Sequence, residues 1–333
     1  MSRDLLKLWK LPAEITITEQ ITGEGFAAEP NFIPTEAKAW IIREMINAGS
    51  KSIQVSNFGN PKMMPQFRDC DELYRQIGQP EGVTFQAPTN NKRALDRVIE
   101  LRKSGCGPQV VEFLIATTDA FNKINLGKTT DEQWKIMEPL VEVAHDAGLK
   151  VMGGIGGIFS CLGTGEKLPP EIALKFAERW MSLGVDRITH AEGGLKGSPG
   201  PNVVYDYFCR MLDKYPDPNL HNFHFHNTNR WGVSCCIAAM QAGVTIFETC
   251  LGGLQGGPEP FLVDRVPVMP LDIRTPLDVQ GAPHMGLVPT EDFVSICAAM
   301  GIKTGLDVDK VLNIGRAVEL IVGRKLSSTY LNW

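Results

Sequence analysis

Short runs of β-branched and apolar residues alternate along this chain with amphipathic stretches of helical period. The short runs predict eight strands, at Glu14–Thr18, Ser52–Val55, Val83–Gln86, Val110–Ile115, Lys150–Gly153, Arg187–His190, Asn222–His226 and Thr245–Glu248. The longer patterns predict helices at Glu36–Ala48, Asp69–Ile77, Lys92–Lys103, Thr130–Ala147, Glu171–Leu183, Val203–Lys214 and Trp231–Ala242. A glycine follows many of these helices as a stop signal, as at Gly49, Gly148, Gly184 and Gly243.

This repetition of strand and helix favours a closed parallel (β/α)₈ TIM barrel with extra C-terminal helices. An open doubly wound sheet is the alternative, but no Gly-x-Gly-x-x-Gly motif follows the first strand. We expect one catalytic domain over residues 1–333, with the barrel at about 14–300 and C-terminal helices at about 301–333. A loop rich in proline and glycine, Gly256–Gly286, follows the eighth strand, and its length is typical of a lid or binding loop.

Composition narrows the class of protein. The net charge of −5 gives no basic footprint for nucleic acid and no polybasic patch for a membrane. The eight cysteines form no Cys-x-x-Cys pair, which indicates reduced thiols rather than a disulfide framework. No secretory signal or membrane-spanning run is visible. We therefore expect a cytoplasmic protein that acts on a small-molecule substrate, without nucleic acid or membrane partners.

Two histidines, His224 and His226, are separated by one residue near the end of the seventh predicted strand. Side chains alternate across a strand, so both imidazoles lie on one face and can bind a divalent metal together. The alternative is a strand end with two satisfied or solvent-facing histidines. Chemistry in a TIM barrel lies at the C-terminal ends of the strands, and residues there also include Glu19, Gln54, Ser56, Asn57, Ser160, Cys161, His190, Glu192, Glu248 and the cluster Gly252–Gly257.

Several motifs carry a resemblance to a known family. They are Asn57–Gln66 after strand 2, Ile188–Gly200 around strand 6, His224–Thr228 with its His-x-His-Asn-Thr pattern, the glycine loop Leu251–Pro258, and Pro289–Asp292. On these segments the chain resembles the hydroxymethylglutaryl-CoA lyase family, from about residue 14 to 325. The resemblance implies a TIM barrel, a homodimer and one divalent metal ion, with Mn²⁺ or Mg²⁺ first and Zn²⁺ or Fe²⁺ as alternatives.

The resemblance implies carbon–carbon cleavage, by a retro-aldol or retro-Claisen route, of a hydroxy-acyl-CoA or a related hydroxy or keto acid. A Claisen-type condensing acyltransferase is one alternative, and a catalytically silent barrel that binds a metabolite is another. We favour a site that is retuned for a different substrate, because the replacements described next keep chemistry that is compatible with a metal.

The chain departs from the family at the site. The family's Arg-Asp pair after strand 1 is expected at Thr18-Glu19, which would remove the arginine's charge and leave Glu19 as a metal ligand. The acidic residue of strand 2 is Gln54, and the aspartate after strand 6 is Glu192. The cysteine of the glycine loop falls at Gly257. The asparagine of the metal shell falls near Leu287, and His284 is the candidate replacement.

The expected site follows from these assignments. Glu192 and His190 are the candidates for proton transfer. Glu192 is equally well interpreted as a structural carboxylate, and His190 as a packing residue. The expected metal ligands are Glu19, His224, His226 and His284, and the expected substrate-binding residues are Gln54, Asn57 and Gln255.

Overall fold

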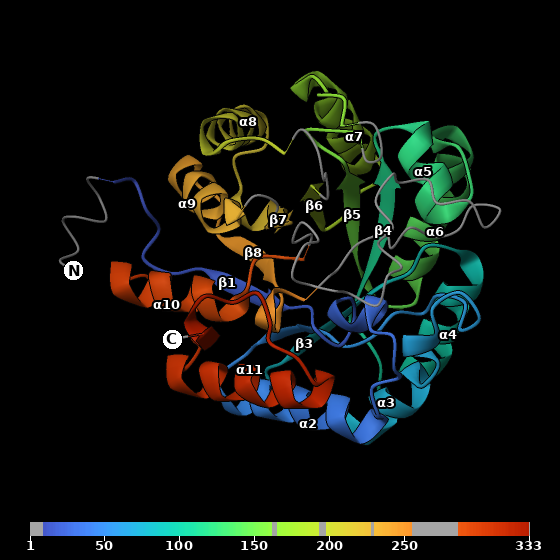
Figure 1. The fold of residues 1–333 in the computed structure, drawn as a ribbon. Helices are drawn as coiled ribbons and strands as arrows, with labels where there is room; N and C mark the ends of the chain where they lie inside the picture. Colours follow the sequence, from blue (N-terminus) through green and yellow to red (C-terminus); the bar gives the residue numbers. More distant parts are fainter. Residues whose placement is uncertain (1–8, 162–164, 193–197, 228–229, 255–285, 333) are drawn as a thin grey trace.

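The computed structural model describes residues 9–161, 165–192, 198–227, 230–254 and 286–332. Eight parallel strands form a closed barrel in chain order (Figure 1). Strand β1 closes the barrel by pairing with β8, with Thr16 opposite Ile246 and Glu19 opposite Thr249. The predicted TIM barrel is confirmed, and its strands are β1 Thr16–Glu19, β2 Ser52–Gln54, β3 Thr84–Pro88, β4 Val110–Ala116, β5 Lys150–Gly156, β6 Arg187–Glu192, β7 His221–Phe225 and β8 Ile246–Thr249.

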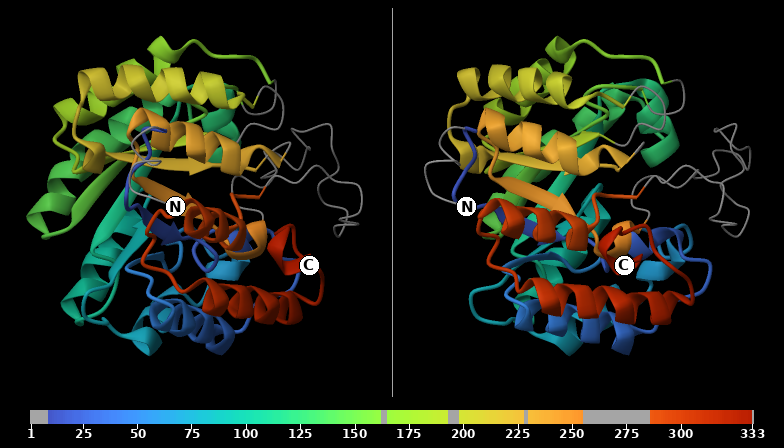
Figure 2. Two further views of the ribbon diagram at one scale, coloured as in Figure 1. Left: turned by 90° about the vertical axis from the view of Figure 1, so that its left-hand side faces the viewer. Right: turned by 60° about the vertical axis from the view of Figure 1, so that its left-hand side comes forward.

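Helices surround the barrel on its outer side (Figures 1 and 2). The last helix, α11, lies alongside α2, which brings the C-terminal part of the chain next to the first helix of the barrel (Figure 2). The helices are α2 Thr35–Asn47, α3 Cys70–Ile77, α4 Lys92–Lys103, α5 Asp119–Leu126, α6 Thr130–Asp146, α7 Pro170–Ser182, α8 Pro201–Lys214, α9 Gly232–Ala242, α10 Thr290–Met300 and α11 Val308–Val322. No helix in these described segments is long and apolar enough to cross a membrane.

Local sequence signals account for the helix ends. Thr129 and Glu132 form a reciprocal capping box at the start of α6. The glycines predicted to stop helices all take positive φ, with 106° at Gly49, 75° at Gly148, 79° at Gly184 and 119° at Gly243. Side chains rarely adopt this conformation, so glycine ends the helix at little cost.

Two features differ from the predicted elements or lie beyond them. Helix α5 was not predicted, because its eight residues, Asp119–Leu126, are too short to show a clear helical period. Nearly all of the loop predicted at Gly256–Gly286 lies outside the described residues.

The interior of the barrel carries polar side chains on several strands. Residues paired in register point to the same face of a parallel sheet, and Gln54 is paired with Gln86 while His224 is paired with Glu248. All four of these side chains are buried. The apolar core instead fills the space between strands and helices, as where Trp180 packs against Gly153. The inside of the barrel therefore carries buried polar and ionisable side chains that can bind a ligand.

Candidate metal centre

Glu24, His224 and His226 form the one group of potential metal ligands found within the described residues. Their ligand atoms all lie within 4.8 Å of one another. The Nε2 atoms of the two histidines are 3.4 Å apart, and Oε1 of Glu24 lies 3.6 Å from Nε2 of His224. Both histidines are buried, and the Glu24 side chain is 20% exposed. The prediction that His224 and His226 share one face is confirmed.

The 3.4 Å separation of the two histidine nitrogens fits a shared divalent ion, and the 3.6 Å separation between Glu24 and His224 is slightly longer. Two ligands at about 2.1 Å from an ion, with angles of about 90° to 109° between them, lie about 3.0 to 3.4 Å apart. Two imidazoles and one carboxylate form a mixed nitrogen and oxygen donor set that suits several divalent metals. The three residues therefore fit a metal ion, with room for other ligands on the cavity side.

Glu248 on β8 orients His224. Nδ1 of His224 lies 2.7 Å from Oε2 of Glu248, while Asn222 and Gln86 donate to Oε1 at 2.7 and 2.9 Å. A carboxylate can only accept, so Nδ1 of His224 carries the proton, and Nε2 of the neutral ring keeps the lone pair that a metal needs.

Charge also affects His224. Burial alone would lower its pKa, but the carboxylates of Glu24 and Glu248 outweigh burial and raise the pKa to about 9. Burial would raise the pKa of Glu248, but the hydrogen bond from His224 and its charge bring it below the usual value. A metal would therefore have to displace a proton from His224 near neutral pH.

A tight turn after β1 brings Glu24 to the histidines. The backbone N–H groups of Gly23, Glu24 and Gly25 all point to the carbonyl of Gln20, at 3.2, 2.8 and 3.1 Å. The flanking glycines allow this close packing, because a Cβ on Gly25 would lie 2.5 Å from Sγ of Cys250. A carboxylate between two glycines was the sequence signal that could have identified Glu24.

This geometry corrects the expectation for Glu19. Oε1 of Glu19 accepts from the backbone N–H groups of Ile21 and Leu251, each at 2.9 Å, and Oε2 accepts from Oγ1 of Thr290 at 2.6 Å. Glu19 therefore joins the barrel to the start of α10 and is not part of the ligand group. The carboxylate beside the histidines is Glu24, so the residue at the place of the family's arginine is Gly23 rather than Thr18.

His190 faces away from the interior of the barrel. Its neighbours Thr189 and Ala191 both line the central cavity, so alternation along β6 turns His190 outward. There Nδ1 of His190 lies 2.8 Å from the hydroxyl of Tyr207, and Nε2 lies 3.0 Å from Nδ1 of His221.

The carbonyl oxygen of Tyr215, at the end of this hydrogen-bonded chain, determines which nitrogen of each histidine donates. Nε2 of His221 lies 2.7 Å from the carbonyl oxygen of Tyr215, so it must donate, and Nδ1 of His221 then accepts from His190. His190 is fixed as a buried packing residue, and its expected role in proton transfer is corrected.

Glu192 also points outward from β6 and is buried. Its carboxylate accepts hydrogen bonds from the backbone N–H of Phe159, at 2.8 Å, and from the hydroxyl of Ser160. Of the two interpretations given for Glu192, this arrangement supports the structural carboxylate.

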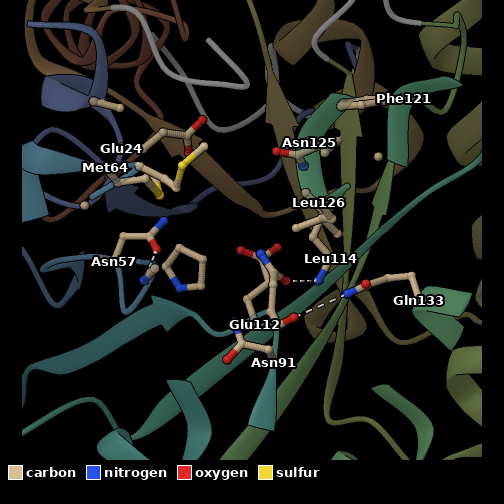
Figure 3. Close-up of a pocket in the computed structure, with 18 of the residues that line it drawn as sticks. Glu24, Asn57, Met64, Asn91, Glu112, Leu114, Phe121, Asn125, Leu126 and Gln133 are labelled. Carbon is tan, nitrogen blue, oxygen red and sulfur yellow. Dashed lines mark hydrogen bonds between the residues drawn. The ribbon is translucent and has the colours of Figure 1, made fainter. Parts of the chain in front are cut away.

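Glu24, His224 and His226 all line a cavity of about 690 Å³. Figure 3 shows this cavity with Glu24 labelled. Gln54 and Asn57, both expected to bind substrate, line this cavity. Gln54 is buried, and its Nε2 has no hydrogen-bond partner within the described structure. Oδ1 of Asn57 accepts from Gly59 N–H at 2.8 Å, which fixes the direction of the amide. His284 and Gln255 lie outside the described residues, whereas buried Leu287 forms a β-bridge with His226.

Glu112 on β4 was missed by the sequence analysis. It lines the cavity and is 8% exposed, and Figure 3 shows it between Asn57 on one side and Leu114 and Gln133 on the other. The signal was available, because a charged residue interrupts the apolar strand Val110–Ala116, and carboxylates are seldom buried without a reason.

Comparisons with known proteins agree with this fold. The HMGL-like family model matches residues 15–318. The hydroxymethylglutaryl-CoA lyase of Bacillus subtilis is 26% identical over 321 residues, which cover 96% of this chain and 97% of that protein. A crystal structure of the Bacillus subtilis HMG-CoA lyase superimposes with a TM-score of 0.83 at 26% identity, over 97% of this chain and 98% of that one.

A second solved structure shows the fold at lower identity. The HMG-CoA lyase of Acinetobacter baumannii, in complex with coenzyme A and 3-methylmalate, has a TM-score of 0.83. It is 23% identical and covers 96% of this chain and 95% of its own. At that identity the likeness concerns the fold alone.

Proposed function

Because the chain belongs to the HMGL-like family, we propose that it is a divalent-metal-dependent carbon–carbon lyase. Its substrate would be a hydroxy-acyl thioester or a related hydroxy acid, cleaved by a retro-aldol or retro-Claisen route. The observation that carries this proposal is the convergence of Glu24, His224 and His226 on the wall of the central cavity.

In this proposal the metal ion activates the substrate, and polar residues of the cavity bind it. A divalent ion held by Glu24, His224 and His226 would polarise a substrate oxygen and stabilise negative charge on it. Mn²⁺ or Mg²⁺ is the ion we propose, with Zn²⁺ or Fe²⁺ as alternatives. Nε2 of Gln54 can donate a hydrogen bond to a substrate oxygen, and Asn57 can offer its amide N–H₂ because Gly59 already engages its oxygen.

The thioester in this proposal rests on the names of the relatives, which are hydroxymethylglutaryl-CoA lyases. Two exposed lysines of the cavity wall, Lys123 and Lys128, are consistent with an anionic ligand. A cytoplasmic homodimer remains part of the proposal.

The first test is the metal content of the purified protein. We expect close to one ion per wild-type chain after incubation with Mn²⁺, and loss of that ion in Glu24→Gln and in His224→Ala/His226→Ala. Glu14→Gln is the control, because Glu14 is an exposed carboxylate outside the ligand group. Wild-type metal content in Glu24→Gln would contradict the site.

Activity is tested next. We expect the metal-loaded wild-type protein to cleave at least one member of a panel of 3-hydroxyacyl-CoA thioesters into an acyl-CoA and a carbonyl product. Metal binding without cleavage of any member, or condensation of the products instead, would contradict the lyase assignment.

A further inference from the structure

We propose that Glu112 is a further catalytic residue of this site, which takes the proton of the substrate hydroxyl and returns a proton to the enolate carbon. This inference rests on the proposed lyase function. It assigns proton transfer to a side chain inside the barrel, in place of His190 and Glu192, which point away from it.

The position of Glu112 supports this role. It projects from the middle of β4 into the same cavity as His224, His226 and Glu24, yet it is not one of the ligand group. Its carboxylate is therefore placed to meet a substrate without serving as a metal ligand. A base or acid must lie within hydrogen-bond reach of the reacting atom, and a side chain on the cavity wall meets that requirement in a way that an outward-facing one cannot.

The glycine-rich strand β5 makes room for this carboxylate. A Cβ on Gly154 would lie 3.1 Å from Oε1 of Glu112 and 2.9 Å from Cδ1 of Leu114. Gly156 also lines the cavity and adds no side chain to it. Gly154 and Gly156 are thereby explained as positions that leave space for Glu112 and a ligand.

Buried and charged groups on several strands act on the Glu112 carboxyl. Burial raises its pKa to about 8, and the charge of Glu248 on β8 adds to this, as does Glu24 after β1. His224 on β7 and a hydrogen bond from Thr189 on β6 act in the opposite direction.

Glu112 alone can accept and return the one proton that the cleavage moves. Its carboxylate accepts the hydroxyl proton, so the substrate O–H bond breaks as an O–H bond forms on Glu112. The electrons of the broken O–H bond form the new carbonyl, and the electrons of the carbon–carbon bond leave with the other fragment as an enolate. Glu112 then gives its proton to the enolate carbon and returns to the carboxylate. No oxidant, reductant or further reactant is needed.

The test is steady-state kinetics of Glu112→Gln with a thioester that the wild-type protein cleaves. We expect kcat to fall by about 10² to 10⁴, with KM, metal content and unfolding midpoint close to wild type. Glu112→Asp should retain more activity than Glu112→Gln. Glu319→Gln is the matched control, since Glu319 is also 8% exposed but lies on α11 outside the cavity.

A partial reaction gives a second readout. In deuterium oxide, the wild-type protein should exchange the α-protons of the acyl-CoA product with solvent, and Glu112→Gln should exchange them at least about 100-fold more slowly. A Glu112→Gln protein with intact metal binding and turnover or exchange within about threefold of wild type would overturn this role. Absence of both reactions in the wild-type protein would instead refute the lyase function, and the role of Glu112 with it.

Discussion

Gln54 fills the space beside Gly23. A Cβ on Gly23 would lie 2.5 Å from Cγ of Gln54 and 2.9 Å from its Nε2. The residue before Glu24 therefore cannot carry a side chain while Gln54 keeps its present position. The position before Glu24 thus carries no charge, and the nearest side chain to it is the neutral amide of Gln54 on the neighbouring strand β2.

Gly23→Ala should destabilise the fold by about 1–3 kcal/mol, because the added methyl group overlaps the Gln54 side chain. Gln54→Ala in the same protein should recover part of that loss, but not all of it, since the backbone oxygen of Gln54 would remain 2.6 Å from the new Cβ. Urea unfolding of both single variants and the double variant measures the coupling between the two positions. Strictly additive effects would show that the two residues do not share this space.

Glu248→Gln should weaken metal binding about 10- to 100-fold, because the hydrogen bond to Nδ1 holds His224 with its lone pair towards the metal group. Removing the charge of Glu248 also reduces proton competition at His224, whose pKa lies at about 9. Titration calorimetry at pH 7 and pH 9 separates the two effects, since competition matters less at the higher pH. An unchanged affinity at pH 9 would argue against an orienting role.

The sequence predicted the barrel because each strand and helix carries its own local signal. Glycine stops such as Gly184 and polar caps such as Thr129 act within a few residues, so they can be found without knowledge of the fold. The pair His224 and His226 was found for the same reason, because strand alternation alone places both on one face.

The rest of the site depends on contacts between distant segments. Glu24 reaches the histidines only through a turn whose course is set by packing against Cys250, more than two hundred residues later in the chain. His190 and Glu192 lie near the C-terminal end of β6, as expected. The sequence does not determine which face of the strand points into the barrel. A shift of one residue reverses that orientation, and this is why the sequence could not separate the catalytic from the structural interpretation of either residue.

His190→Gln should leave metal content and turnover near wild type, because His190 lies in a buried cluster with Tyr207 and His221 rather than at the cavity. The glutamine amide can still accept from Tyr207 and donate to His221, so we expect a loss of about 1–2 kcal/mol at pH 7.5. A loss of turnover with intact metal binding would restore His190 as a candidate for proton transfer.

The same cluster should make stability depend on pH. Burial lowers the pKa of both His190 and His221 below the usual 6.5, so the unfolded chain binds protons that the folded chain does not. Their contribution is complete above about pH 6.5 and is lost as the pH falls below that value. Urea unfolding between pH 7.5 and pH 5 should show a shallower decline in His190→Gln than in wild type. His145→Gln, which changes a partly exposed histidine, is the control.

Glu19 should give the opposite pH dependence. Burial raises its pKa from 4.5 to about 7 against the hydrogen bonds from Thr290, Leu251 and Ile21. The folded chain therefore holds a proton that the unfolded chain releases between about pH 4.5 and pH 7, and stability falls with rising pH across that window. Glu19→Gln removes this dependence. The free energy of unfolding of the variant minus that of wild type should therefore be larger at pH 8 than at pH 5, by on the order of 2 kcal/mol. Glu19→Gln should also retain its metal, and loss of metal with an intact fold would return Glu19 to the ligand group.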